Sequence, residues 1–258
     1  MSDTLKNHVE KNRHKISGDS QKGGFPPIAD SMTLFIHPLT HNPIKLQLVM
    51  SYMSHESERI RQYLRNIQVK TVELEQLEHK SDHFQRLNPN GKVPVLIHND
   101  LTLWESNAIG QYLANYFSSE LWPYGADQQA SLLRWLLWET GCWDSVVGNM
   151  LLNEFYFPFW GFPGDDRRKD RNRRKFKELA TVLNRQLQRN RCINGDDFSL
   201  ADLSIGASVM HLDSIDLDVT PYPAFQAWRS LLSQQSWWQD VQKDIQNFQR
   251  NGAMALSI

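Results

Sequence analysis

Residues 88–117 read NPNGKVPVLIHNDLTLWESNAIGQYLANYF, and this stretch decides the fold. Val93-Pro94-Val95 begins an apolar strand with a proline just inside it. Because proline donates no hydrogen bond to a sheet, that position must be a sheet edge, a strand start or a cis turn. A cis bond between Val93 and Pro94 would leave the main chain of Val93 free for a ligand.

A hairpin and a helix follow in the same stretch. Asn99-Asp100 is a turn signal between two short apolar runs, residues 94–98 and 101–104. Glu105-Ser106 then opens a helix over residues 106–117, and the free N–H groups at such a helix start hold carboxylates well.

The flanking sequence extends this pattern. Residues 33–37 and 69–74 read as strands, a helix starts at Pro43, and a short helix covers about 81–87. A charged insertion of about ten residues begins at 54–59 and is expected to prolong the first helix. The predicted order is β-α-β-α-β-β-α, a thioredoxin-like unit. The rest of the chain reads as helices over residues 126–153, 168–189, 200–213, 223–234 and 237–248.

Four motifs occur in the order seen in one known family. Glu-His-Lys at 78–80, NPNGKVPVL and Glu105-Ser106 resemble the thioredoxin-like domain of glutathione S-transferases. Ser199-Leu200-Ala201-Asp202 resembles the capping box of the buried helix in their all-helical domain. The resemblance covers roughly residues 32–243. It implies a flexible extension (1–31), a thioredoxin-like glutathione-binding domain (32–118), a linker (119–125) and an all-helical domain (126–258).

Glutathione is the co-substrate that this resemblance implies, and it assigns roles along the chain. Glu105 would take the γ-glutamyl ammonium and Ser106 the γ-glutamyl carboxylate. The main chain of Val93, beside Pro94, would pair with the cysteinyl backbone. The remaining glutathione-binding candidates face the glycyl carboxylate or the peptide backbone in relatives and are otherwise ordinary solvated loop residues: His79, Lys80 and Lys92.

The thiolate of glutathione needs a donor near the start of the first helix. Asn42 before Pro43 reads as an N-cap, which places Thr40 just ahead of the helix. In the serine-using transferases a serine donates to the thiolate, and the matching residue here is Thr40. Thr40 with Asn42 also resembles the Nu-class disulfide reductases, although these have Asn-Gly where this chain has Asn-Pro. Which of the two contacts the thiolate stays open, and His37 and His41 are expected to be ordinary loop histidines.

The pocket for the second substrate is expected between the domains, with Leu39, Tyr156 and Trp160 as candidate lining. Tyr156 and Trp160 belong to an aromatic stretch, residues 155–162, that reads either as the wall of an apolar site or as packing and dimer contact. The run 132–138 is apolar on nearly every face of its helix, which predicts a homodimer.

Composition excludes several classes of function. The formal charge of -1 gives no global attraction to nucleic acid or to acidic membranes. Eight basic residues within 167–177 are interpreted as a solvated helix face, diluted by nearby aspartates. No apolar run is long enough to span a bilayer or to form a signal peptide. Cys142 and Cys192 have no metal-ligand spacing, so we expect no metal site and a cytoplasmic protein.

Three functions remain open on the sequence. The first is an enzyme that activates glutathione for conjugation to an apolar electrophile. The second is a glutathione-dependent disulfide reductase in which glutathione supplies the thiols. The third is a non-catalytic regulatory or binding protein on the same fold, suggested by the N-terminal extension and the helix insertion.

Overall fold

The computed structural model describes residues 31–251, and from Ser31 on the chain forms one compact unit by its contacts. The predicted N-terminal extension therefore lies outside the described residues, except for Ser31. The described part begins with a four-stranded sheet in the order β2-β1-β3-β4. Its strands are β1 (Met32–Ile36), β2 (Gln68–Thr71), β3 (Val95–His98) and β4 (Leu101–Trp104).

The strand register follows from burial. β1 pairs in parallel with β2 and antiparallel with β3, so that Leu34 lies opposite both Val69 and Leu96. Alternate residues of β1 are fully buried, which is the period expected of a strand with one face on the core. β2 ends at Thr71, three residues earlier than the sequence pattern predicts.

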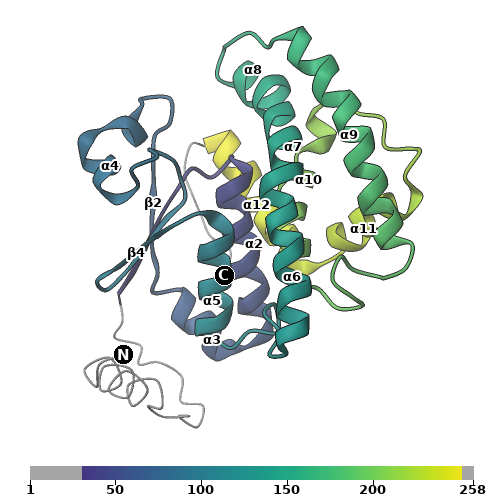
Figure 1. The fold of residues 1–258 in the computed structure, drawn as a ribbon. Helices are drawn as coiled ribbons and strands as arrows, with labels where there is room; N and C mark the ends of the chain where they lie inside the picture. The colour runs from purple at the N-terminus through teal and green to yellow at the C-terminus, as the bar shows by residue number, and fades with distance from the viewer. Residues whose placement is uncertain (1–30, 252–258) are drawn as a thin grey trace, which may run out of the picture. The chain divides into compact units, whose positions relative to one another are not determined.

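Helix α2 (His41–Glu56) is buried along most of its length. Twelve of its sixteen residues are buried, because it packs against α5 (Ser106–Tyr116), α10 (Leu200–Val209) and α12 (Ser236–Asn251). Figure 1 shows α2 between the sheet with α5 and the later helices. α2 therefore packs into the hydrophobic core on two sides, against α5 on one side and against α10 and α12 on the other.

The start of α2 corrects one prediction. The helix begins at His41 with Thr40 as its N-cap residue, so Asn42 lies in the first turn and is not the N-cap. The physical reason is that the Asn42 amide has other partners, since its Oδ1 accepts a hydrogen bond from Ser106 Oγ at 3.2 Å. Pro43 is then the third helical residue, where the missing N–H costs nothing.

The charged insertion also behaves differently from the prediction. α2 ends at Glu56, Ser57 is extended, and a separate helix, α3 (Glu58–Leu64), follows. The insertion therefore breaks the first helix and does not prolong it.

The segment between β2 and β3 is held by local hydrogen bonds. It contains a 3₁₀ turn, η1 (Glu78–Lys80), and a short helix, α4 (Asp82–Leu87), capped by Ser81 Oγ. Asn88 then fixes the next loop, since its Nδ2 donates to the Lys92 carbonyl at 2.7 Å. Gly91 has φ 55°, and a Cβ there would lie 2.7 Å from the His79 carbonyl oxygen, so only glycine fits. The Val93-Pro94 bond is cis, as one reading of the sequence predicts.

The second half of the chain is helical, as predicted. One continuous helical path runs through α6 (Ala126–Trp138), the π-helical turn η2 (Glu139–Trp143), α7 (Asp144–Leu151), a second π-helical turn η3 (Leu152–Tyr156) and α8 (Phe157–Phe159). It is followed by α9 (Asp166–Leu187), α10, the 3₁₀ turn η4 (Leu212–Ser214), α11 (Pro223–Ser233) and α12. The observed order confirms a thioredoxin-like domain followed by an all-helical domain.

The predicted capping box at the start of α10 is present. Asp202 is fully buried, and its carboxylate accepts the Ser199 N–H at 3.0 Å and the Ile193 N–H at 2.9 Å. The indole Nε1–H of Trp228 donates to it at 2.8 Å. Burial raises the pKa of Asp202, while these hydrogen bonds act in the opposite direction. One side chain thus joins the start of α10 to the preceding loop and to α11.

Asp202→Ala is expected to lower the free energy of unfolding by about 3–5 kcal/mol, because it leaves several buried donors without an acceptor. The measurement is urea denaturation followed by circular dichroism. Asp197→Ala, an exposed position in the same loop, is the matched control and should change stability by less than about 0.5 kcal/mol. Equal stabilities for the two variants would show that the capping box does not hold the domain together.

His211, after α10, is a second buried polar link. Its Nε2 lies 3.0 Å from the Leu39 carbonyl oxygen, and because a carbonyl only accepts, Nε2 carries the proton. The ring stacks on Phe155 with centroids 4.9 Å apart. Burial, aided by the charge of His41 and opposed by the Leu39 hydrogen bond, lowers the pKa of His211 to about 4.

This pKa predicts a loss of stability in mild acid. The unfolded chain takes up the proton at a higher pH than the folded protein does, so the free energy of unfolding falls as the pH drops from 6.5 to about 4. His211 alone should account for about 3 kcal/mol of that fall. Urea denaturation across this range should give a flatter pH dependence for His211→Gln and an unchanged one for the exposed control His83→Gln. An unchanged slope in His211→Gln would contradict the assignment.

Candidate functional site

A cavity of about 550 Å³ lies at the start of α2. The thioredoxin-like domain forms one side of it with residues from the β1–α2 loop and from the loops around η1 and the cis proline. These are chiefly Thr40, His41, Asn42, His79, Lys80, Gly91, Lys92 and Val93. The helical path forms the other side with Thr140, Asp144, Ser145, Gly148, Asn149, Leu152, Tyr156 and Trp160.

Thr40 is half-buried and lies directly before the first residue of α2. Its Oγ1 donates to the His37 carbonyl at 3.3 Å, a long hydrogen bond that a stronger acceptor would replace. In the first turn of α2 the His41 N–H donates to Tyr156 Oη, Pro43 has no N–H, and the Ile44 N–H donates to the Thr40 carbonyl. The N–H of Asn42, together with the helix dipole, is therefore what this helix end offers to an anion.

His41 is the residue that the sequence reading undervalued. Its Nε2 lies 2.5 Å from Asp144 Oδ1, and its main-chain N–H donates to Tyr156 Oη at 3.0 Å. Burial would raise the pKa of Asp144, but His41 foremost, with Lys45 and Asn42, lowers it well below its usual range. Asp144 is therefore ionised at neutral pH. No local signal in the sequence pairs residues 41 and 144, because they meet only when the two domains pack.

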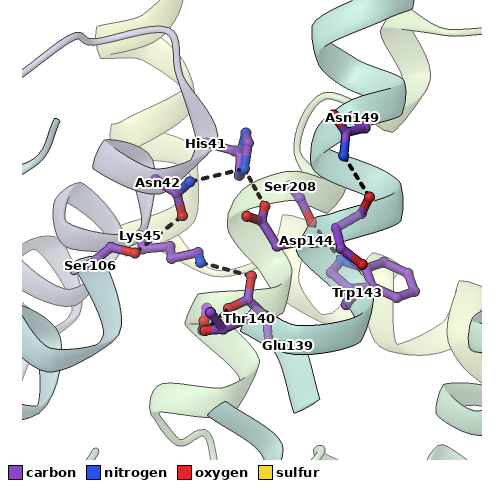
Figure 2. Close-up of polar contacts among 12 residues, drawn as sticks. His41, Asn42, Lys45, Ser106, Glu139, Thr140, Trp143, Asp144, Asn149 and Ser208 are labelled. Carbon is purple, nitrogen blue, oxygen red and sulfur yellow. Dashed lines mark hydrogen bonds and ion pairs between the residues drawn. The ribbon is translucent and has the colours of Figure 1, made fainter. Parts of the chain in front are cut away.

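Asn42 links this pair to the start of α5. Its Nδ2 lies 3.3 Å from His41 Nε2, and its Oδ1 accepts from Ser106 Oγ at 3.2 Å. Figure 2 shows the resulting line of contacts from Ser106 through Asn42 and His41 to Asp144. The side chain of Asn42 lines the cavity, but both of its polar ends are already directed at protein groups.

Glu105 and Ser106 lie at the start of α5, as predicted, and neither is part of the cavity lining. Ser106 is buried, whereas Glu105 is exposed and adopts φ 74° and ψ 112°. A positive φ is rare for a residue with a side chain, and such positions concentrate at functional sites. No residue pattern around Glu105 predicts this conformation.

The remaining predicted glutathione contacts differ in exposure. His79 and the main chain of Val93 are half-buried, while Lys80 and Lys92 are exposed. Lys80 Nζ donates to the Gly91 carbonyl at 3.0 Å. Burial, followed by the charge of Lys80, lowers the pKa of His79. Within residues 31–251, the main chain of Val93 has no hydrogen-bond partner. Pro94 is buried behind the cavity.

The helical wall of the cavity is mixed in polarity. Four of its residues recur at helical spacing along α7: Asp144, Ser145, Gly148 and Asn149. The π turns η2 and η3, directly before and after that helix, add Thr140, Leu152 and Tyr156. Tyr156 is buried against His41, whereas Trp160 is half-buried, and both line the cavity as predicted. Leu39 does not line it: its side chain is buried and its carbonyl is held by His211. The predicted pocket residue Leu39 is therefore a core residue.

A buried ion pair between α2 and η2 lies next to the site. Lys45 Nζ lies 2.7 Å from Glu139 Oε1, with both side chains nearly inaccessible to solvent, and Asn107 Nδ2 donates to Glu139 Oε2 at 2.9 Å. Figure 2 shows this pair beside the His41–Asp144 contact. The Lys45–Glu139 ion pair and the His41–Asp144 hydrogen bond thus join α2 to the helical path.

A metal-binding group of side chains and a membrane-spanning helix are both absent from the described residues. Among residues 31–251, no group of His, Cys, Asp and Glu side chains has a metal-binding arrangement. Within the same range, no helix is long and apolar enough to cross a membrane. Both cysteines are free thiols, and neither lines the cavity.

Known proteins share both halves of this architecture. The family model described as Glutathione S-transferase, N-terminal domain, matches residues 31–115, and the corresponding C-terminal domain model matches residues 148–235. Glutathione S-transferase GstB of Escherichia coli strain K12 is 30% identical over 161 residues, which cover 61% of this chain and 76% of that protein. Glutathione S-transferase F10 of Arabidopsis thaliana is 27% identical over 173 residues, covering 66% of this chain and 78% of that one.

Solved structures agree with the sequence matches. A glutathione S-transferase III in apo form superimposes with a TM-score of 0.72 at 25% identity, covering 83% of this chain and 97% of that one. A glutathione S-transferase I bound with lactoylglutathione gives 0.69 at 25% identity, covering 81% and 97%. The two domains, their order and the matched relatives lead to one conclusion: the chain belongs to the glutathione S-transferase family.

Proposed function

We propose that this chain binds glutathione in the cavity at the start of α2 and activates its thiol for conjugation to an apolar electrophile. The observation that carries the proposal is that Thr40, Val93 and the first turn of α2 converge on one cavity of about 550 Å³. The lactoylglutathione bound to a relative of the same fold supports a glutathione-like ligand.

Thr40 is the proposed donor to the thiolate. A thiol has a pKa near 8.5, and each unit of lowering requires about 1.4 kcal/mol. The helix N-terminus contributes about 0.3–1 kcal/mol and a hydroxyl donor to an anion about 1.5–3 kcal/mol, which together lower the pKa by about 1 to 3 units. Asn42 is the weaker candidate, because its Oδ1 already accepts from Ser106 Oγ and its Nδ2 is directed at the His41–Asp144 pair.

The peptide part of glutathione is assigned to the neighbouring loops. The free main chain of Val93 pairs with the cysteinyl backbone. The start of α5 at Glu105 and Ser106, which adjoins the cavity lining at the Ser106–Asn42 hydrogen bond, takes the γ-glutamyl group. His79, Lys80 and Lys92 supply positive or hydrogen-bonding groups for the glycyl end. In the reaction, the thiol proton leaves to water, the sulfur forms a bond to the electrophilic carbon, and the leaving group departs with the electron pair.

Thr40→Ala should separate thiol activation from binding. We expect binding of glutathione within about threefold of the unmodified protein, but turnover of an aryl halide at pH 6.5 lowered by about 10- to 100-fold, because the thiol pKa rises by one to two units. Thr40→Ser should restore most of the activity, and Thr102→Ala, an exposed threonine of β4, should have no effect. The measurements are calorimetry and steady-state kinetics.

Ser106→Ala should act on binding instead. We expect glutathione to bind about tenfold more weakly, which corresponds to the loss of about 1.4 kcal/mol. Failure of the unmodified protein to bind glutathione in calorimetry would remove the proposed function altogether.

Disulfide reduction is the second candidate, and one observation favours it. The wall of the cavity formed by the helical domain carries Thr140, Ser145 and Asn149, which suit a polar, peptide-like substrate better than an apolar one. Since no cysteine lines the cavity, glutathione would supply both thiols. A higher rate with hydroxyethyl disulfide than with aryl halides would favour reduction, and tight binding without either activity would indicate a regulatory binding protein.

We also propose a homodimer in the cytoplasm. Leu133 and Leu137 lie one helical turn apart on α6 and are 42% and 64% exposed, which leaves an apolar face for a partner. The sparse, unpaired cysteines suit a reducing compartment.

The double variant Leu133→Glu/Leu137→Glu should shift the protein from dimer to monomer in analytical ultracentrifugation, because charge cannot be buried unpaired in an interface. Val182→Glu, an exposed apolar position on α9, is the control and should leave the mass unchanged. A monomeric unmodified protein would contradict the dimer.

A further inference from the structure

His41 is held at two atoms by the helical domain. Its ring Nε2 contacts Asp144 Oδ1 at 2.5 Å, and its main-chain N–H donates to Tyr156 Oη at 3.0 Å. The two rings of His41 and Tyr156 are also stacked, with an interplanar angle of 12°. A residue at the first position of α2 is thus fixed in both side chain and main chain by groups from another domain.

The contact between His41 and Asp144 requires a residue without a side chain at Gly148 of the helical domain. A Cβ on Gly148 would lie 2.5 Å from Asp144 Oδ1 and 3.1 Å from His41 Nε2. A real Cβ almost never approaches a polar atom that closely, so a side chain at residue 148 would push the pair apart. Gly148 is not in the left-handed region of φ, and its small size is explained by this close approach.

The charged and polar groups around His41 come from four elements. Asp144 belongs to α7, Asn42 and Lys45 to α2, Tyr156 to η3, and His211 follows α10. Among these, Asp144 is the carboxylate in direct contact with the His41 ring. The contact therefore joins a negative group of the helical domain to the turn that carries Thr40.

A second pair of the same type lies at the other end of α2. His55 Nε2 is 3.2 Å from Asp240 Oδ2 of α12. Both ends of one helix are thus tied to the helical domain by a histidine and an aspartate, but only the first pair borders the cavity. The distal pair provides an internal control.

We infer that Asp144 is a positioning residue that holds the Thr40 turn through His41, so that the Thr40 hydroxyl is aligned with the thiol of bound glutathione. The inference rests on the proposed function of the cavity. Both ring nitrogens of His41 face protein groups, Nε2 toward Asp144 and Nδ1 at 3.5 Å from Tyr156 Oη, which is the arrangement of a fixed support and not of a free base. The clamp consists of Asp144, His41 and Tyr156.

The test compares variants at the two ends of α2 in the full chain. Asp144→Ala removes the contact, Asp144→Asn keeps an oxygen that accepts from His41, and Gly148→Ala separates the pair while leaving both side chains present. Asp240→Ala is the matched control. Hydrogen exchange of peptides covering residues 37–46 and 50–57 is measured by mass spectrometry, together with kcat and KM for glutathione.

We expect Asp144→Ala to speed exchange in residues 37–46 and to lower kcat at least tenfold, with KM for glutathione within threefold. Gly148→Ala should lower kcat in the same direction, and Asp144→Asn should recover most of the loss. Asp240→Ala should speed exchange only in residues 50–57 and leave kcat within twofold. That pattern distinguishes positioning from a general loss of stability, which would affect both ends alike.

Two results overturn the inference in different ways. An active unmodified protein whose Asp144→Ala variant keeps its kcat, or loses no more than Asp240→Ala does, overturns the clamp and leaves the proposed function standing. An unmodified protein without glutathione turnover overturns the proposed function, and with it the inference that Asp144 aligns Thr40 for the reaction. In that second case the exchange data still report whether Asp144 holds the turn.

Discussion

The burial of α2 is the constraint on which the rest of the structure depends. A helix that is covered on nearly every side needs apolar side chains all round, and the few polar groups it carries must find partners inside the protein. Lys45 meets this need with Glu139, and His41 with Asp144. Because those partners belong to the helical path, α2 is positioned correctly only when both domains are folded. The fold and the cavity are therefore consequences of the same packing.

Because α2 depends on both domains, its buried polar contacts determine how the two domains are arranged. Buried charged pairs contribute little net stability, since desolvation offsets most of the attraction, but removal of one partner is costly. Their effect is to select one arrangement of the two domains over alternatives with similar apolar contact. The capping box at Asp202 acts in the same way within the helical domain, where one carboxylate satisfies donors from three segments.

The sequence predicts features that depend on local chemistry. The cis Val93-Pro94 bond, the hairpin at Asn99-Asp100 and the capping box each follow from a few neighbouring residues, and the structure contains them. Features that require distant residues were missed. Asn42 was wrongly predicted as the N-cap because Ser106, its actual partner, is 64 positions away, and His41 was undervalued because Asp144 is 103 positions away. Leu39 was assigned to the pocket although only the packed structure shows which way a side chain next to a loop turns. The placement of Thr40 at the helix start follows from the sequence, because Pro43 marks the first turn of α2.

The two π turns on either side of α7 have a consequence for the length of the helical wall of the cavity. A π turn accommodates one residue more than an α-helical turn, and each residue of a helix turns its successors by about 100°. Because the extra residue is absorbed within the turn, the helical segments before and after η2 or η3 keep the faces that they turn toward the cavity. Deletion of one residue from either π turn would leave an ordinary α-helical turn, so the helical wall tolerates a change of one residue in length at these two places without a change in the side chains of α7 that line the cavity.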